Sequence, residues 1–174
     1  MQSLLIRPAT LEDIVPITAI YAHAVECGTA SFELEPPSQA EMFARMKALL
    51  DGGFPYLVAE SDETILGYAY AALYRTRPAY RFTLEDSVYV APDMHGRGIG
   101  RSLLDCLVTN SEQRGFRQMI AVIGDSAQTA SIELHRAVGF RIAGTLSNVG
   151  FKFGRWLDTV LMQRQLGHGA LTKP

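Results

Sequence analysis

The chain has 174 residues, of which 48% are hydrophobic and 20% are charged, a balance typical of one soluble globular domain. Its formal net charge of -2, with no run of lysine or arginine, excludes the basic surface of a nucleic-acid-binding protein. The N-terminal residues lack a basic segment followed by an apolar one, and no apolar run approaches the roughly 20 residues of a membrane span. We therefore expect a cytoplasmic protein with neither nucleic acid nor membrane as a partner.

The two cysteines, Cys27 and Cys106, are far apart in the sequence and belong to no CxxC pattern. They indicate two reduced thiols, as in a cytoplasmic protein, and the sequence predicts no metal site. We expect a single domain over residues 1–166. The last residues, 167–174, lose the apolar periodicity and are expected to form a flexible tail.

The first third of the chain predicts a short strand followed by two helices. Leu4 to Arg7 is a short apolar segment. Thr10 then precedes two acidic residues and an apolar pattern at helical spacing that begins at Ile14. The segment CGTASFELEPP breaks this pattern and predicts a loop. A second helix follows Ser38, which heads a capping box, and ends at Gly52.

The middle of the chain changes to the patterns of strands. PYLVAE and TILGYAYAALY flank the turn residues Ser61 and Asp62 and predict a hairpin, and FTLEDSVYVAP predicts a third strand. A glycine-rich loop and a helix from about Ile99 to Glu112 come next.

The last third predicts a short buried strand, QMIAVIG, and a helix over residues 129–137 that ends at Gly139. FRIAGTLS and TVLMQRQL predict two final strands, with a loop between them that contains Gly150, Gly154 and Trp156. The complete order is β, α, α, β, β, β, α, β, α, β, β. It predicts an α/β (α+β) domain, in which a mixed sheet is flanked by helices.

The stretch HGRGIGRSLL places Gly96, Gly98 and Gly100 at alternate positions, directly before a helical pattern. The N–H groups at a helix N-terminus attract an anion, and Arg97 and Arg101 add positive charge. The loop has neither the Gly-Lys-Ser/Thr of a P-loop nor the GxGxxG spacing of a dinucleotide site. A pyrophosphate such as that of coenzyme A remains, and the alternative is a tight turn with two solvated arginines.

The segments VYVAPDMHGRGIGRSLL and SIELHRAVGF resemble the cofactor-binding core of the GNAT superfamily of N-acetyltransferases, whose loop pattern is Gln/Arg-x-x-Gly-x-Gly/Ala. His95 stands at the Gln/Arg position, and Gly98 and Gly100 match the later ones. TLEDSVYVAP and GFKFGRWLDTVLMQ are similar to the phosphinothricin acetyltransferase branch in particular. The resemblance extends nearly from Leu5 to Leu166. It implies the GNAT fold, with a largely antiparallel central sheet that is splayed at its middle.

The same resemblance implies that acetyl-CoA lies in the V-shaped gap where the strand around Val88 splays from the strand around Met119. Backbone groups of Val88 and Val90, on either side of Tyr89, would bond the pantetheine arm and the acetyl carbonyl. Gln128, where relatives commonly carry Asn, would contact the same arm, as would Ser131. The pyrophosphate would lie on the backbone N–H groups of His95, Gly96, Arg97, Gly98, Ile99, Gly100 and Arg101.

Acetyl transfer from a thioester to an amine requires a neutral amine, a donor to the oxyanion and a proton for the thiolate. The resemblance makes Glu85 the general base, whereas Asp86 faces the other side of the strand. The N–H of Val90 would stabilise the oxyanion. His135 stands where other relatives carry Tyr and would donate the proton; a structural hydrogen-bonding histidine is the alternative. Neither cysteine lies in this site, so we expect direct transfer.

The segment YRTRPAYRF places Arg75, Arg77 and Arg81 ahead of Glu85, on one face if the chain continues as a strand. Because arginine suits bidentate recognition of a carboxylate, this predicts a small amino acid whose amine reaches Glu85. Solvated arginines at a strand end are the alternative. In the resembling branch, the chains pair as homodimers, and two loops border the amino-acid pocket. Here those loops contain Phe32, and Lys152 to Trp156.

The resemblance implies an acetyl-CoA-dependent enzyme that acetylates the α-amine of phosphinothricin, methionine sulfoximine and methionine sulfone. One alternative is an N-acetyltransferase of protein N-termini or of another small amine. Another is an acyl-CoA-binding sensor without turnover. Glu85 favours an enzyme, because a sensor does not need a carboxylate beside the acetyl group.

Overall fold

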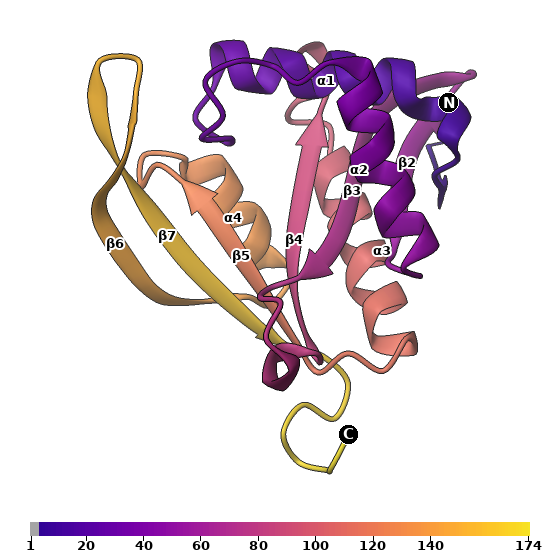
Figure 1. The fold of residues 1–174 in the computed structure, drawn as a ribbon, viewed down its shortest axis with the longest axis vertical. Helices are drawn as coiled ribbons and strands as arrows, with labels where there is room; N and C mark the ends of the chain where they lie inside the picture. The colour runs from indigo at the N-terminus through magenta and orange to yellow at the C-terminus, as the bar shows by residue number, and fades with distance from the viewer. Residues whose placement is uncertain (1–3) are drawn as a thin grey trace.

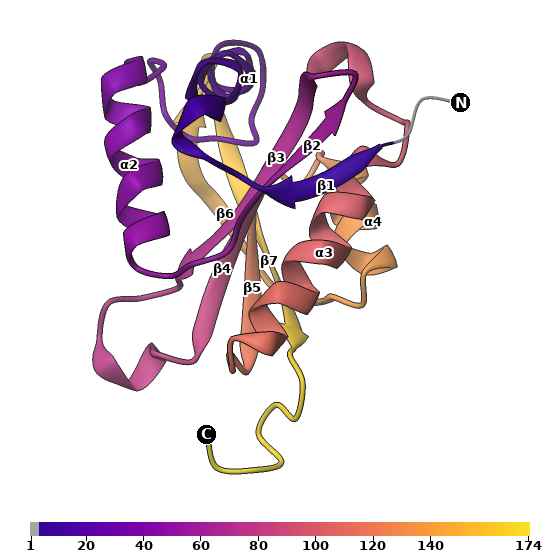
Figure 2. The same ribbon diagram turned by 90° about the vertical axis from the view of Figure 1, so that its right-hand side faces the viewer.

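In the computed structural model, which describes residues 4–174, the chain forms one seven-stranded sheet with helices on both of its faces (Figures 1 and 2). The order of helices and strands along the chain is the one that the sequence predicts. The strands lie in the order β1-β2-β3-β4-β5-β7-β6. The elements are β1 (Leu5–Pro8), α1 (Ile14–Cys27), α2 (Gln39–Asp51), β2 (Tyr56–Ser61), β3 (Thr64–Leu73), β4 (Thr83–Val90), α3 (Ile99–Gln113), β5 (Gln118–Gly124), α4 (Thr129–Ala137), β6 (Arg141–Lys152) and β7 (Arg155–Gln165).

Local sequence signals explain where several helices begin and end. The Ser38 hydroxyl accepts the N–H of Glu41 at 3.2 Å and so caps α2, as predicted. Gly98 caps α3 in the left-handed conformation, with φ +80. Gly115 and Gly139 follow α3 and α4 with φ +85 and +88, a conformation that glycine adopts without steric cost.

Two hydrophobic cores lie on the two sides of the sheet. Helices α1 and α2 cover one face, where Ile17 and Met46 pack against Tyr68. Helices α3 and α4 lie on the other face, where Leu103 and Leu107 pack against the sheet (Figure 2). Residues of β4 alternate between the two cores, so this central strand presents side chains to both pairs of helices.

The sheet opens at its middle because β4 and β5 pair over only part of their length. They form a parallel pair from Thr83↔Gln118 to Asp86↔Ala121, and the pairing stops there. Strand β5 then continues alongside β7 as far as Gly124↔Thr159, while β4 continues alongside β3. The two strands therefore diverge into a V-shaped gap with its apex at Asp86 (Figure 1). The splayed, largely antiparallel sheet is confirmed.

The hairpin at the end of the chain is longer than predicted. The expected loop around Gly150 is absent from the described structure, since β6 runs to Lys152 and β7 starts at Arg155. Only Phe153 and Gly154 form the turn, with φ +52 and +72, the pattern of a two-residue hairpin. Lys152 and Trp156 are therefore strand residues, and their placement in a loop was wrong. The apolar pattern does not reveal the full length of these strands, because most of their side chains face solvent.

The arginine-rich segment does not continue β3 as a strand, so the condition for a shared face of the arginines is not met. The strand ends at Leu73, and Pro78 begins a short 3-10 turn that ends at Tyr80. Arg75 and Arg77 lie in the loop between these elements. A proline at the first position of a helical turn fits its fixed φ, which explains why the extended pattern stops here.

Residues 167–174 form neither helix nor strand. Arg117 contacts this tail, donating to the Thr172 hydroxyl at 3.0 Å and to the Lys173 carbonyl at 3.3 Å. The flexibility of the tail stays a prediction. Over residues 4–174, no helix combines the length and the apolar character needed to cross a membrane.

Candidate active site

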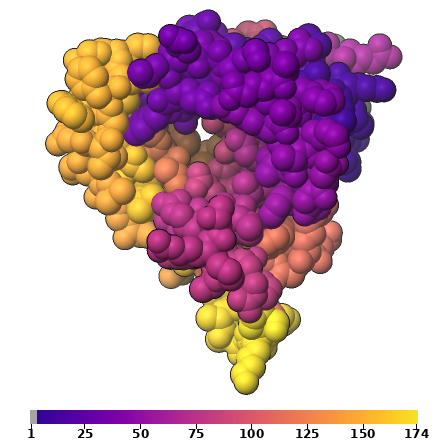
Figure 3. Space-filling view, viewed as in Figure 1, coloured from indigo at the N-terminus to yellow at the C-terminus, as the bar shows by residue number. Residues whose placement is uncertain are grey.

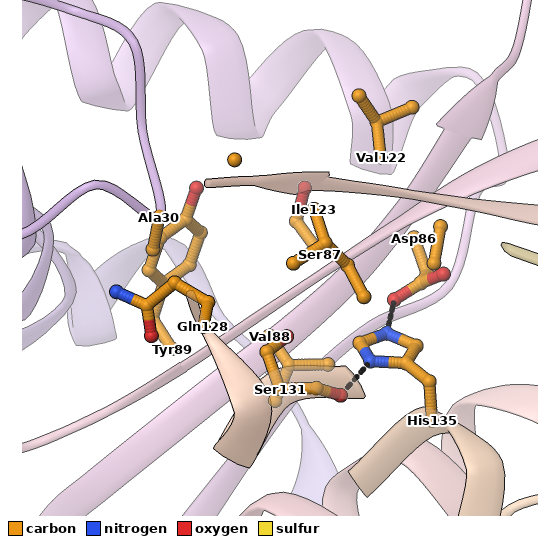
Figure 4. Close-up of a pocket in the computed structure, with 12 residues that line it drawn as sticks. Ala30, Asp86, Ser87, Val88, Tyr89, Val122, Ile123, Gln128, Ser131 and His135 are labelled. Carbon is orange, nitrogen blue, oxygen red and sulfur yellow. Dashed lines mark hydrogen bonds and ion pairs between the residues drawn. The ribbon is translucent and has the colours of Figure 1, made fainter. Parts of the chain in front are cut away.

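The gap between β4 and β5 contains a cavity that is visible as a hollow in the space-filling view (Figure 3). It is lined by β4, β5, the first turns of α4 and the loop between α1 and α2 (Figure 4). A second cavity of about 440 Å³ lies beside it, under the glycine loop. Both cavities are lined by Ala30, Val88, Gln128 and Ser131, so they form adjoining parts of one cleft.

Strand β4 presents unpaired backbone groups to this cleft. The Ala91 N–H donates to the Leu66 carbonyl on the β3 side at 2.9 Å. Because N–H groups alternate along a strand, those of Val88 and Val90 point to the opposite edge, into the gap. His95, at the position that relatives fill with Gln or Arg, donates from Nε2 to the Val90 carbonyl at 3.0 Å. Its ring thus fixes the end of β4 against the glycine loop.

The glycine loop offers free N–H groups at the start of α3. The first bond within this helix runs from the Ser102 N–H to the Gly98 carbonyl at 3.0 Å. The four N–H groups of residues 98–101 therefore have no partner inside the helix. Gly96 and Gly98 have φ +75 and +80. These values let the chain turn so that its N–H groups face the cleft, where a pyrophosphate fits.

Gly100 has a different role from the other two glycines. A Cβ at this position would lie 3.3 Å from Leu134 and 3.6 Å from Val90. Its absence lets α3 pack closely on β4 and α4, so this glycine serves helix packing. Arg97 and Arg101 are exposed at the rim of the loop, and Arg101 lies 3.6 Å from Asp105. Their charge is available to an anion at the loop.

A buried ion pair occupies the apex of the gap. His135 of α4 donates from Nδ1 to the Ser131 carbonyl at 2.7 Å, and its Nε2 lies 2.9 Å from Asp86 Oδ2 (Figure 4). Burial alone disfavours the charged ring, but the hydrogen bond and the charge of Asp86 outweigh it and raise the pKa of His135. Asp86 Oδ1 is buried without a hydrogen-bond partner among the described residues. Both ring nitrogens therefore have a partner, which fixes the ring beside the cavity.

Glu85 lies on the opposite face of β4 from Asp86, the side covered by α1 and α2. It is half-buried, and burial raises the pKa of its carboxyl, whereas the positive charge of Arg75 opposes this rise. Glu85 does not itself line the cavity, but Ser87 does. That residue lies two positions along the same face, about 6.6 Å away. Glu85 thus lies beside the gap, on the face of β4 that carries Ser87.

Comparison with known proteins accounts for this arrangement. Residues 6–161 match the acetyltransferase (GNAT) domain family. The chain belongs to the GNAT family. The match covers most of the chain and includes the splayed strands, the glycine loop and α4, so the cleft lies within the family's domain.

Two relatives and one solved structure show where in this family the GNAT chain lies. It is 59% identical to phosphinothricin N-acetyltransferase of Alcaligenes faecalis, over 97% of this chain and 86% of that protein. It is 41% identical to L-methionine sulfoximine/L-methionine sulfone acetyltransferase of Pseudomonas paraeruginosa, over 92% of this chain and 94% of that protein. A phosphinothricin acetyltransferase from Sinorhizobium meliloti, solved in complex with acetyl-CoA, superposes with a TM-score of 0.96 at 49% identity. The match covers 98% of this chain and 92% of that structure's chain.

The arginines of this GNAT protein lie near Glu85 but not on a shared strand face. The Arg75 guanidinium stacks on Tyr74, 4.1 Å from the ring centre, and donates to the Tyr74 carbonyl at 2.8 Å. Arg77 lines a separate shallow cavity beside Tyr80. The proximity of Arg75 to Glu85 therefore arises from the loop, and binding of a substrate by either arginine stays a prediction.

The three residues predicted to border the substrate have different surroundings in this GNAT chain. The Phe32 ring lies against Gly124 and Gly150, at the end of the gap. The Lys152 ammonium points inward and donates to loop carbonyls, and binding of a substrate by Lys152 stays a prediction. Trp156 is 62% exposed, meets the Phe151 ring edge-on with the ring centroids 5.2 Å apart, and lines neither cavity of the cleft.

Sequence reasoning placed the loop between α1 and α2 at the amino-acid pocket but missed its contact with Gln128. Gln128 donates from Nε2 to the Thr29 hydroxyl at 2.9 Å, although the family pattern suggested only a cofactor contact. Ala30, the next residue, lines both cavities. No local pattern indicates this, because the loop and Gln128 are about a hundred residues apart in the chain.

Proposed function

We propose that this GNAT protein transfers the acetyl group of acetyl-CoA to the α-amine of small amino-acid-like molecules. The observation that carries the proposal is the free edge of β4, which points into a cleft bounded by the start of α3, with Glu85 on the neighbouring face of the same strand. The names of the relatives above support the substrate class. Acetyl-CoA supplies the thioester that the amine attacks.

In this proposal, the free N–H groups of residues 98–101 bind the pyrophosphate, together with the charges of Arg97 and Arg101. The N–H groups of Val88 and Val90 bind the pantetheine arm and the acetyl carbonyl. Ser131 and Gln128 lie along the same cleft and contact the arm.

Catalysis is divided between the two faces of β4. Glu85 takes the proton of the substrate ammonium, and its raised pKa reduces the free-energy cost of that transfer. As the N–C bond forms, the Val90 N–H stabilises the oxyanion. The C–S bond then breaks: His135 gives its Nε2 proton to the departing thiolate, and the second proton that the nitrogen loses in forming the amide restores the ring beside Asp86.

The substrate proposed here is a zwitterion, and Arg75 and Arg77 bind its carboxylate. Phosphinothricin, methionine sulfoximine and methionine sulfone have the same α-amino acid group and a tetrahedral polar head. Phe32 borders the stem between the two groups. An amine held by its own carboxylate near Arg75 lies close to Glu85, because the charge of Arg75 acts on that residue.

A thiol-release assay with acetyl-CoA tests this function. The three amino acids are compared with matched primary amines that lack a carboxylate and with peptides of free N-terminus. We expect rapid turnover with the amino acids alone. Preference for peptides would support acetylation of protein N-termini instead. Binding of acetyl-CoA without turnover of any amine would support a sensor, and both outcomes contradict the proposal.

We also propose that the protein is a cytoplasmic homodimer formed through the β6–β7 hairpin. Apolar side chains of this hairpin are half or more exposed, and patches of this kind mark protein interfaces. Size-exclusion chromatography with light scattering is expected to give a dimer, and Trp156→Asp a monomer. A monomeric wild type would contradict this. The residues concerned are Leu146, Val149, Phe151, Phe153 and Trp156.

A further inference from the structure

We propose that Lys152 is a positioning residue for acetyl transfer, because it holds residues 28–33 as a roof over the open end of the gap. We call these residues the roof. They join α1 to the loop before α2 and span from the β4 side of the cleft to the β5 side. The kinetic part of this proposal rests on the proposed function, whereas its structural part does not.

The Lys152 ammonium lies inside the roof and binds two of its carbonyls. It donates to the Gly28 carbonyl at 2.9 Å and to the Ser31 carbonyl at 2.8 Å, and the residue is only 4% exposed. These two acceptors are three residues apart, so a single side chain closes the segment into a turn. Lys152 comes from β6, the edge strand on the β5 side of the gap. It thus ties the roof to the strands on that side.

Burying an ammonium is costly, and no carboxylate compensates it directly. Among residues 4–174, no Asp or Glu forms an ion pair with Lys152. Burial lowers the pKa of Lys152, and the charge of Glu33 opposes this only in part. An apolar side chain would avoid the desolvation cost if packing were the only requirement. What Lys152 provides beyond packing is donors for two carbonyls of the roof.

The neighbouring strands leave room for the roof at two glycines. A Cβ on Gly124 of β5 would overlap the Thr29 carbonyl, and a Cβ on Gly150 of β6 would overlap the Phe32 ring. A second tie comes from α4, where Gln128 donates to the Thr29 hydroxyl at 2.9 Å. Tyr21 of α1 holds the other end, with its hydroxyl 3.0 Å from that of Ser31. The roof is thus held from three elements.

The roof matters for the reaction because one of its residues forms the wall of the cleft. Ala30 lies between the two carbonyls that Lys152 binds, and it lines both cavities (Figure 4). Lys152 lines neither of them, so it acts only through the roof. The glycine loop lines only the second cavity, whereas the first cavity contains Ser87, on the face of β4 that carries Glu85. Loss of Lys152 is therefore expected to impair the amino-acid acceptor more than acetyl-CoA.

The test compares Lys152→Met, which keeps the length of the side chain but removes the donors, with Lys47→Met. Lys47 is an exposed lysine of α2 paired with Asp51, and its loss controls for removal of a lysine. Because charged hydrogen bonds are lost, we expect the KM for methionine sulfone to rise about tenfold or more. The KM for acetyl-CoA should stay within about twofold, a change too small to reflect a lost hydrogen bond. Equal increases in both KM values, or none in either, would overturn the proposal.

A second variant, Thr29→Val, removes the tie to Gln128 and keeps the shape of the side chain. We expect the same split between the two KM values, so this variant carries the test if Lys152→Met does not fold. Because both ties hold one segment, the variant that combines Lys152→Met with Thr29→Val should raise the KM for methionine sulfone by less than the product of the two single effects. Independent effects that multiply would contradict a shared role in the roof.

Amide exchange of the protein bound to coenzyme A separates this proposal from the proposed function. Lys152→Met should increase exchange at residues 29–33, while the start of α3 keeps its protection. This holds whether or not any amino acid is acetylated. If the wild type acetylates none, the proposed function fails, but the roof is still tested. Unchanged exchange at residues 29–33 in Lys152→Met would refute the roof.

Discussion

Replacing Glu85 with Gln separates the chemistry of the base from the shape of the site. The two side chains have nearly the same size, so the packing of β4 is retained, but Gln cannot accept a proton. At pH 7, an amine with a pKa of about 10 is neutral in about one molecule in a thousand. The wild type converts the abundant ammonium through Glu85, whereas the variant depends on the small neutral fraction.

This fraction sets the size and the pH dependence of the effect. We expect kcat/KM for methionine sulfone to fall by about 10²- to 10³-fold at pH 7, within the range for loss of a general base. The activity of the variant should then rise about tenfold for each pH unit as the amine loses its proton. The deficit should therefore nearly disappear by about pH 10.

Stability should change in the opposite direction. Burial raises the pKa of Glu85, so the folded state favours the neutral carboxyl, and this stabilising contribution is lost as pH rises through the raised value. At pH 7 the charged group destabilises the fold relative to an uncharged side chain. Glu85→Gln should therefore unfold at a higher temperature than the wild type.

The assay is thiol release from acetyl-CoA between pH 6 and 10, accompanied by thermal unfolding at pH 7. Glu63→Gln, at the exposed turn between β2 and β3, is the matched control and should leave both measurements unchanged. A variant whose deficit stays constant from pH 7 to 10 would refute the assignment of Glu85 as the base. So would an unchanged kcat/KM at pH 7.

The remaining predictions concern the ion pair, the glycine loop and the arginine. Asp86 raises the pKa of His135 in the folded state, so the pair stabilises the fold fully below pH 6.5 and this contribution is lost as pH rises through the raised pKa. The unfolding temperature of His135→Asn should lack this pH-dependent decrease. Gly98→Ala should lower the unfolding free energy by about 1–2 kcal/mol in urea titrations, because φ is +80 there. Arg75→Ala should raise KM for amino acids more than for amines without a carboxylate. It should also move the acid limb of the rate profile to higher pH, because Arg75 holds down the pKa of Glu85.

Most elements were predictable because their patterns are local. Helix α2 begins at a capping serine, α3 follows glycines, and β5 is a short apolar run between polar turns. The errors lie where a local pattern does not decide the structure. Exposed side chains hide the ends of β6 and β7, so the hairpin was predicted too short.

The candidate site was predictable only in part, for the same reason. The glycine loop was visible because left-handed residues before a helix leave a sequence signal. The parity of β4 correctly placed Glu85 and Asp86 on opposite faces. The partner of Asp86 was not visible, since His135 comes from a helix 49 positions later in the chain. The inward direction of Lys152 also depends on strand ends that were not predicted.

A single strand satisfies the three requirements of acetyl transfer because its side chains and its backbone edge point in different directions. Glu85 faces α1 and α2, on the side where Arg75 lies. Asp86, the next residue, faces α4 and holds His135. At Asp86 the pairing with β5 stops, so the following N–H groups of β4 are left free at the edge between the two faces. The proposed base, oxyanion donor and proton donor thus belong to two faces and one edge of the same strand, and the splay opens that edge to the proposed thioester.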